Sequence, residues 1–369
     1  MDTKYKDFTY YCPTRIYYKV DGAKSVGSII KNDYGFESVF VVCSSSSIKS
    51  KLIDKVTFSL QDEGIKYLTY TNILANPDIE DVLKMKEIIV DFKPELILAV
   101  GGGSVIDSSK LLAHLYYYEG NPLDFNKRVV KPINALKVAT ILTIAASGSE
   151  MSSSCVISDR KTNFKGGFNS DTNYPLFSIL DPTLTYSVSE KQTGYGLVDM
   201  FSHSFERYYS YSFEIEPSDY LALATMKGII DISSSVLKNK EDYQARRAMM
   251  LLGSISHNGF TDFGKNKKFV IHPAEHYLSG KYPTLAHGQG IALLLIPFLE
   301  VNKDNKVIYN KTIQLGKKIF SLLNPSFEDV LISIKKWLDS LPIASSFDDL
   351  DIKISKEDID IAIKKLKIS

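Results

Sequence analysis

Residues 96–107 read LILAVGGGSVID, an apolar run that ends in three glycines and continues into a polar segment. The run 96–100 is typical of a strand that is buried on both faces. Residues 104–118 carry apolar side chains at helical spacing, and Ser104 and Asp107 have the separation of a capping box. A strand that turns through glycines into a helix is the unit from which parallel sheets are built.

The same alternation extends outward from this unit through the first half of the chain. We predict strands at 38–43, 65–69, 139–142 and 177–180, and helices at 48–63 and 79–92. After Asp181-Pro182 the pattern becomes helical throughout, with predicted helices at 189–211, 220–238, 242–258, 269–279, 287–300, 305–322, 327–338 and 356–366. The sequence therefore predicts a Rossmann-like α/β domain at 1–183, with right-handed crossovers, and an all-α domain at 184–369.

The composition is that of an ordinary globular protein, and it excludes several classes of partner. The 44 Lys and Arg residues nearly balance the 43 Asp and Glu residues, so no strong field recruits nucleic acid or an anionic membrane. The three cysteines form no CxxC pair, which fits a reducing compartment. The apolar run 291–299 is too short to cross a bilayer, and no signal peptide is recognisable. We expect a cytoplasmic protein without nucleic-acid or membrane partners.

Two loops of small residues suggest a nucleotide-binding edge. Gly101, Gly102 and Gly103 let the backbone approach a phosphate, and the helix that follows offers free N–H groups. A second loop, AASGSE at 145–150, also follows a predicted strand. The first loop is not GxGxxG, and a tight strand-to-helix turn is the alternative reading. Two such loops on one sheet favour a nucleotide at the carboxyl ends of the strands.

A run of serines follows the first predicted strand, where the adenosine ribose lies in nucleotide-binding sheets. An acidic residue here binds the ribose of NAD, whereas this chain has hydroxyls and an ammonium group. The candidate contacts are Ser44, Ser45, Ser46, Ser47 and Lys49. They favour NADP, with NAD still possible; the alternative is a polar surface turn.

The stretch 199–287 of the second half contains five of the six histidines, and four of them, His203, His272, His276 and His287, belong to short motifs. Asp199 and His203 are four residues apart, as are His272 and His276, so each pair shares one face of a helix. With His287 they make five candidate ligands for a divalent transition metal, Fe²⁺ or Zn²⁺. Spacing does not decide which of the five is instead a proton carrier, and ordinary core or surface histidines are the alternative.

Residues around this stretch have lesser expected roles. Glu206 and Glu275 flank it and are possible partners of ligating histidines. His114 and His257 stand apart from the five candidate ligands in the sequence, and we interpret both as structural.

In this order the motifs resemble the iron-containing (group III) alcohol dehydrogenases, in the branch of butanol dehydrogenases and NADP-dependent aldehyde reductases. They are GGGSVID, ASGSE, LDP, GLVD-x3-H-x2-E, H-x3-H and AHG before an apolar run, and they cover nearly the whole chain. The resemblance implies the two-domain architecture of dehydroquinate synthase, reversible hydride transfer between a primary alcohol or aldehyde and NAD(P), and a homodimer.

The resemblance also implies a role for each candidate residue. The metal would be bound by Asp199, His203, His272 and His287 between the two domains, and His276 would relay protons. The cofactor would contact Asn76, Gly101, Gly102, Gly103, Ser104, Asp107, Thr143, Ser147, Lys165 and Leu180. Ser147 stands where the family has threonine, Ala145 where it commonly has proline, and the serine run replaces a glycine-rich turn.

Two other readings use the same architecture. Dehydroquinate-synthase-like lyases and glycerol-dehydrogenase-like enzymes share the GGGS turn, but the lyases need extra basic residues for a phosphorylated substrate. No Lys/Arg cluster accompanies the metal motifs here. A nucleotide-binding protein that has lost catalysis is the third reading, and the complete ligand set argues against it.

Overall fold

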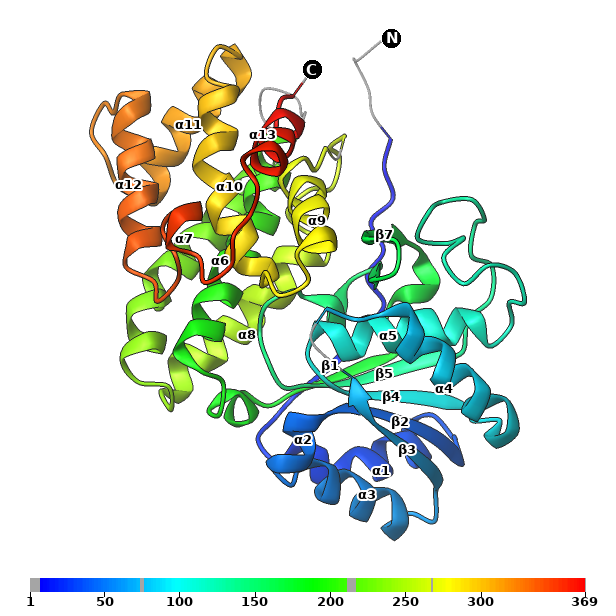
Figure 1. Cartoon of the computed structure of the whole chain (residues 1–369). Helices are drawn as coiled ribbons and strands as arrows, with labels where there is room; N and C mark the ends of the chain where they lie inside the picture. Colours follow the sequence, from blue (N-terminus) through cyan, green and yellow to red (C-terminus); the bar gives the residue numbers. More distant parts are fainter. Residues whose placement is uncertain (1–6, 74–75, 211–216, 267, 369) are drawn as a thin grey trace. The chain divides into compact units, whose positions relative to one another are not determined.

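The computed structural model describes residues 7–73, 76–210, 217–266 and 268–368 of the chain (Figure 1). It divides into two compact units, Tyr11–Ser187 and a helical unit of Val188–Ser369 with the residues up to Tyr10. The expected boundary at 183/184 thus differs by four residues, and the N-terminal stretch was assigned to the other domain. Its rings explain this placement, because Phe8 stacks on Phe263 and Tyr10 packs edge-on against Phe260.

The α/β unit is built on a six-stranded sheet in which every neighbouring pair is parallel. The strand order is β1-β8-β5-β4-β2-β3. The strands are β1 (Arg15–Tyr18), β2 (Ser38–Ser44), β3 (Lys66–Ile73), β4 (Leu96–Gly101), β5 (Lys137–Leu142) and β8 (Phe177–Leu180). The predicted parallel sheet is confirmed, and all the carboxyl ends lie along one edge.

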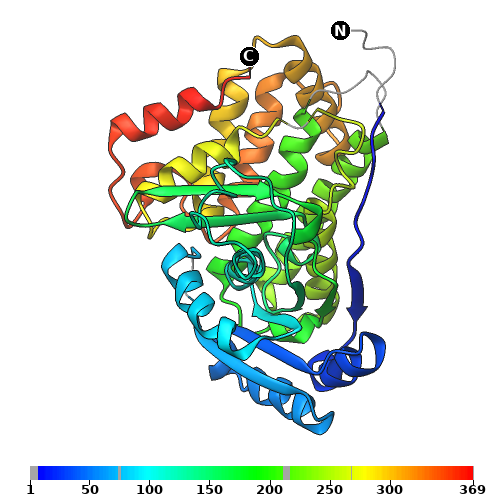
Figure 2. The same cartoon turned by 90° about the vertical axis from the view of Figure 1, so that its right-hand side faces the viewer.

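Three strands were missed by the sequence reading. Edge strand β1 has four residues, too few to show a period. The hairpin of β6 (Ser154–Asp159) and β7 (Phe164–Asn169) contains Gly166 and Gly167, which weaken the strand signal. The pair forms a separate antiparallel ribbon, drawn in green in Figure 2.

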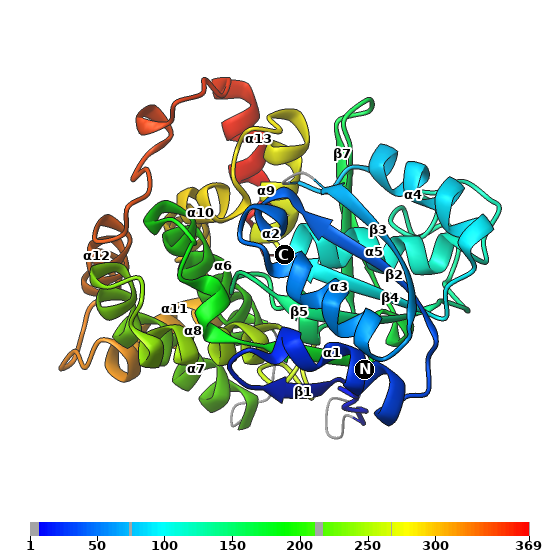
Figure 3. The same ribbon diagram turned by 90° about the horizontal axis from the view of Figure 1, so that it is seen from below.

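Helices cover both faces of the sheet. Short α1 (Val26–Ser28) and α3 (Leu52–Asp62) pack on the face that carries Val39, Leu98 and Ile141, and they lie across the sheet in Figure 3. Helices α4 (Ile79–Phe92) and α5 (Gly103–Leu115) lie on the opposite side (Figure 1). Because both faces are covered, β4 is buried at every residue, which explains its unbroken apolar run.

The capping box predicted at Ser104 and Asp107 is wrong. Helix α5 begins one residue earlier, at Gly103, and its N-cap is Gly102 without a side-chain hydrogen bond. Asp107 instead accepts hydrogen bonds from Ser149 Oγ at 2.5 Å and from Val156 N at 3.0 Å. Buried Lys110 donates to Ser149, Ser152 and Ser154, so this turn of α5 anchors the loop after β5.

The helical unit is organised around α6 (Glu190–Tyr209), which is buried along nearly its whole length. Around it pack α7 (Pro217–Lys238), α8 (Tyr243–His257) and α10 (His287–Val301). Helix α9 (Ile271–Lys281) packs on α10 and α13 (Lys356–Lys365), and α11 (Lys306–Ile319) packs on α12 (Phe327–Asp339). The predicted helix 189–211 ends at a position outside the described residues.

In the described part of the chain, α7 is long and apolar enough to span a membrane by length and composition alone. It packs against α6, α8 and α11 within the helical unit. An apolar helix of a globular core meets the same criteria, so this feature does not indicate a membrane protein.

Candidate metal and cofactor sites

The candidate metal ligands come from three helices of the helical unit. Asp199 and His203 lie one turn apart on α6, His272 is the second residue of α9, and His287 is the first residue of α10. Asp199 Oδ1 lies 3.9 Å from His203 Nδ1, 3.8 Å from His272 Nε2 and 3.6 Å from His287 Nε2. Three histidines that span 84 positions of the sequence, 287 − 203, thus lie around one carboxylate oxygen.

The donor atoms of this cluster fit a divalent metal. Asp199 Oδ1, His203 Nδ1 and His272 Nε2 are buried and have no hydrogen-bond partner among the described residues. A buried polar atom without a partner is costly, and a bound cation removes that cost. Ligand atoms of Asp199, His272 and His287 lie within 4.8 Å of one another, and tetrahedral coordination places such atoms about 3.4 Å apart. The donor atoms of these three residues therefore lie within reach of one divalent ion such as Fe²⁺ or Zn²⁺, whereas His203 is not part of this group.

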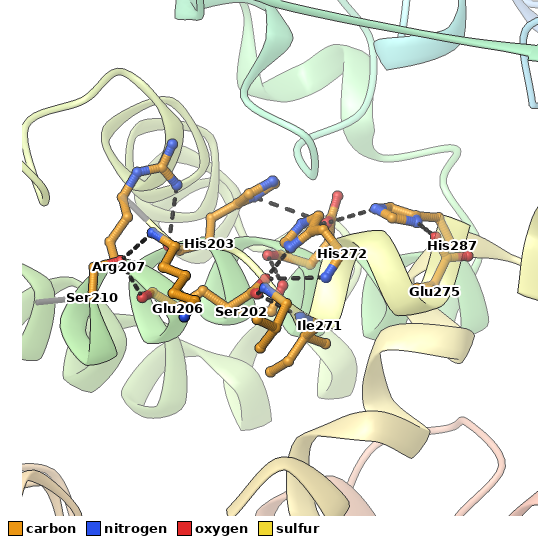
Figure 4. A network of polar contacts seen from close by, with 12 residues as sticks. Ser202, His203, Glu206, Arg207, Ser210, Ile271, His272, Glu275 and His287 are labelled. Atoms are coloured by element: carbon orange, nitrogen blue, oxygen red, sulfur yellow. Dashed lines mark hydrogen bonds and ion pairs between the residues drawn. The ribbon is translucent and has the colours of Figure 1, made fainter. Parts of the chain in front are cut away.

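Two buried glutamates lie behind the histidines. Glu206 of α6 bonds to His272 Nδ1, and Glu275 of α9 bonds to His287 Nδ1 (Figure 4). Both side chains are almost completely buried, at 1% and 0% exposure. The sequence reading named these two residues only as possible partners, since nothing local in the sequence places them against a histidine.

The surroundings of His272 and His203 shift the pKa values of these two candidate ligands in opposite directions. Burial opposes the protonation of His272, but the Glu206 and Asp199 carboxylates outweigh it and raise the pKa of His272 to about 9 in the metal-free chain. Burial lowers the pKa of His203 well below its ordinary value, and neighbouring His257 and His272 lower it further. The environment thus favours the protonated form of His272 and the neutral form of His203.

The remaining histidines fall into two groups. His276 lies beside the cluster, with its ring centre 5.5 Å from that of His287, and it forms a second possible metal-holding group with Glu275 and His287. His257 does not stand apart, as its distance in sequence suggested; its ring packs edge-on against His203 at 4.0 Å. His114 hydrogen-bonds Asn134 O and Asn173 Oδ1 and is 1% exposed, as expected of a structural histidine.

The cofactor candidates lie mostly at the carboxyl edge of the six-stranded sheet. Ser44 ends β2, Gly101 ends β4 and Leu180 ends β8, while Thr143 immediately follows β5. Asn76 follows β3 in the left-handed conformation that asparagine tolerates. Cofactor candidates thus lie at or just after the carboxyl ends of five parallel strands, along one edge of the sheet. The N-terminus of α5, which follows β4, lies at the same edge.

Lys165 belongs to the hairpin rather than to that sheet. It pairs with Ser158, which bridges Asp78, two residues after Asn76. The hairpin therefore places Lys165 one strand away from the segment that leaves β3, with Ser158 of β6 between them. This proximity was not visible in the sequence, where the two residues are 89 positions apart.

Two of the cofactor candidates, Asp107 and Ser47, form hydrogen bonds inside the fold. Asp107 is buried and bonds to Ser149 and Val156, so it supports the loop after β5 rather than lining an open surface. Ser47 is buried and donates to Val100 O, which ties α2 (Ser45–Lys49) to β4. Ser45, Ser46 and Lys49 are exposed and Ser44 is half-buried.

Two different reasons favour glycine in the turn after β4. A side chain there would clash with neighbouring residues, and it would also hinder the approach of a phosphate to the backbone. A Cβ on Gly102 would lie 2.3 Å from Ile144 Cγ2, and one on Gly103 would lie 2.5 Å from Ser147 Oγ. The alternative reading of a tight turn is therefore correct in part. It does not exclude phosphate binding, because the same lack of side chains leaves the first turn of α5 accessible.

We expect Gly102→Ala to raise the KM for NAD(P) about tenfold, since the clash with Ile144 displaces the turn. Initial rates at varied cofactor concentration measure the effect. The double variant Gly102→Ala/Ile144→Ala removes the clashing methyl group and is expected to recover most of the affinity. An unchanged KM in the single variant would contradict a role for this turn in cofactor binding.

Comparison with known proteins agrees with this arrangement. Residues 13–182 match the family model of iron-containing alcohol dehydrogenases, and residues 193–366 match the C-terminal model of the same family. NADH-dependent butanol dehydrogenase A of Clostridium acetobutylicum is 34% identical over 85% of this chain and 80% of its own length. NADPH-dependent aldehyde reductase YqhD of Escherichia coli is 28% identical over 88% of this chain and 82% of its own.

A solved structure shows the same fold. The crystal structure of NADH-dependent butanol dehydrogenase A from Thermotoga maritima superposes with a TM-score of 0.90 at 30% identity, covering 98% of this chain and 90% of that one. The chain belongs to the iron-containing alcohol dehydrogenase family, in the branch of butanol dehydrogenases and aldehyde reductases. It is a metal-dependent, NAD(P)-linked oxidoreductase whose substrates are small-molecule alcohols or aldehydes.

Proposed function

We propose that Asp199, His203, His272 and His287 hold the catalytic metal and that His276 carries the proton of the reaction. The convergence of three of these ligands on Asp199 Oδ1, in a buried cluster with unsatisfied polar atoms, supports the assignment most directly. His276 lies at the edge of the cluster and is half-buried, which suits a group that exchanges protons with solvent.

The protein residues have separable tasks in this reaction. When bound, a divalent iron or zinc ion supplies Lewis-acid polarisation of the alcohol or aldehyde oxygen. The glycine turn and the N-terminus of α5 bind and orient the cofactor pyrophosphate, which leaves hydride chemistry to the nicotinamide. His276 accepts the hydroxyl proton when an alcohol is oxidised and returns it in the reverse direction.

Metal analysis combined with a substrate panel tests this function. The purified chain is expected to hold one equivalent of Fe²⁺ or Zn²⁺ and to oxidise NAD(P)H with short aldehydes. Metal-free protein without turnover, even after reconstitution with either ion, would instead favour a nucleotide-binding protein that has lost catalysis.

We further propose that the enzyme prefers NADPH to NADH. Exposed Ser45, Ser46 and Lys49 at the end of β2 offer hydroxyls and a positive charge to a 2′-phosphate. The relatives include enzymes named for each cofactor, so family membership leaves the preference open.

Lys49→Glu should reduce kcat/KM for NADPH about tenfold or more and leave that for NADH little changed, because a charge-assisted contact contributes about 1.5–3 kcal/mol. Lys137→Glu is the matched control, since exposed Lys137 begins β5 at the opposite edge of the sheet. A wild-type preference for NADH would refute the proposal directly.

We propose a cytoplasmic homodimer, in keeping with the balanced charge and the absence of a disulfide pattern in the sequence. Sedimentation of the purified chain tests the assembly, and a monomer at micromolar concentration would contradict it.

A further inference from the structure

We propose that Glu206 and Glu275 are positioning residues that set the tautomers of His272 and His287 so that Nε2 of each ring is free to bind the metal. This inference rests on the proposed function, because it requires these two histidines to be metal ligands. It assigns a task to two buried carboxylates that have no part in the chemistry described above.

The geometry of each ring distinguishes its two nitrogens. Nδ1 of His272 and of His287 bonds to a buried glutamate, whereas Nε2 lies 3.8 Å and 3.6 Å, respectively, from Asp199 Oδ1. An ionised carboxylate only accepts hydrogen bonds, so Nδ1 must carry the proton. A neutral imidazole with a proton on Nδ1 presents its lone pair on Nε2, toward the cluster.

Glu206 is itself held rigidly by backbone groups. Its Oε1 accepts from Val270 N and Ile271 N, both at 2.6 Å, and its Oε2 accepts from His272 N at 3.3 Å. These are the first N–H groups of α9, whose N-cap residue provides no side-chain hydrogen bond. One carboxylate from α6 therefore caps α9 and orients the ligand that α9 carries.

Glu275 repeats this relation one helix further along the chain. It lies on α9, three residues after His272, and it orients His287 at the start of α10. Gly290 of α10 permits the close approach, because a Cβ there would lie 2.8 Å from Glu275 Cγ. Each carboxylate thus comes from a helix earlier in the chain than the ligand it orients, and the two hydrogen bonds link α6 to α9 and α9 to α10.

His203 provides an internal contrast. Its Nδ1 has no hydrogen-bond partner in the described part of the chain, and its ring packs against His257. Among the three proposed histidine ligands of the described chain, a buried glutamate bonds to Nδ1 only in His272 and His287.

Glu206→Gln is the most informative variant, because the backbone N–H groups around this side chain fix the orientation of the glutamine amide. The amide oxygen is needed at Val270 N and Ile271 N, so the amide NH₂ has to face His272 Nδ1. That NH₂ is a donor and favours the opposite tautomer, with the proton on Nε2. In Glu275→Gln the amide can turn to keep its oxygen on Nδ1, so a smaller effect is expected, whereas Glu275→Leu removes the acceptor altogether.

The affinity of the metal-stripped full chain for Zn²⁺ is measured by competition with a chromophoric chelator. Expected losses are about 10–100-fold for Glu206→Gln and Glu275→Leu, and less for Glu275→Gln. Glu300→Gln, at an exposed position of α10, is the control and should bind like wild type. Nitrogen-15 NMR of the Zn²⁺-loaded wild type should show His272 and His287 protonated on Nδ1, a readout that a merely structural role does not predict.

Wild-type Zn²⁺ affinity in folded Glu206→Gln and Glu275→Leu would overturn the inference, as would protonation of Nε2 in the loaded wild type. If Glu206→Gln fails to fold, because it also weakens the cap of α9, Glu275→Leu and the NMR result decide. A wild-type chain that binds no Zn²⁺ would refute the proposed metal site itself, an outcome distinct from loss in the variants alone.

Discussion

His272→Ala is expected to abolish metal binding and to lower kcat/KM by about 10³-fold or more, since polarisation of the substrate oxygen by the metal contributes several kcal/mol. The substitution removes one of the two histidine nitrogens closest to Asp199 Oδ1. The buried negative charge of Asp199 then has fewer neighbouring groups that stabilise it. Metal content per chain and steady-state rates with a short aldehyde measure the two effects.

The fold should survive this change, because His272 is the second residue of a helix whose first turn is also held by Glu206. Circular dichroism therefore separates loss of metal from loss of structure. A folded His272→Ala variant that keeps one equivalent of metal would show that the ligand set is different and that His276 takes part in it.

His276→Ala is expected to keep the metal and to lose turnover by about 10²–10⁴-fold, the range for removal of a general acid–base group. The ring of His276 lies farther from the cluster than the proposed ligands do, with its centre 6.4 Å from that of His272. The effect should fall mainly on kcat, and external imidazole or another small base should restore part of the rate.

The two histidine variants serve as controls for each other, since both positions lie on α9 and are four residues apart. A His276→Ala variant that loses metal as His272→Ala does would reverse the assignment. The second candidate group, Glu275 with His276 and His287, would then become the better description of the centre.

Most of the fold was predictable because its signals are local. Buried β4 is a continuous apolar run, and the glycines that follow it are needed within a few residues, at the start of α5. Predictions of local structure were wrong where a residue that fits a local motif bonds instead to residues distant in the sequence. The capping box failed because Asp107 bonds to Ser149 and Val156, which are 42 and 49 residues away.

The candidate site also has a part that local spacing predicts and a part that depends on tertiary packing. The helical period by itself places Asp199 beside His203, and His272 beside His276, because four residues make about one turn. The resemblance to a known family distinguished four ligands from a proton carrier, a choice that spacing left open. Neither source indicated that His257 packs against His203, since 54 residues separate them and only the packing of α8 on α6 brings them together.

The amino-acid sequence by itself thus determined the parallel α/β domain, the helical domain and the set of candidate ligands, because each depends on periodicity or on residues within one turn. Only the tertiary structure decided which nitrogen of His272 and of His287 faces Asp199 Oδ1. That choice depends on Glu206 and Glu275, which reach these rings from 66 and 12 residues away. A hydrogen bond between helices is fixed by how the helices pack, and no spacing within either helix encodes it.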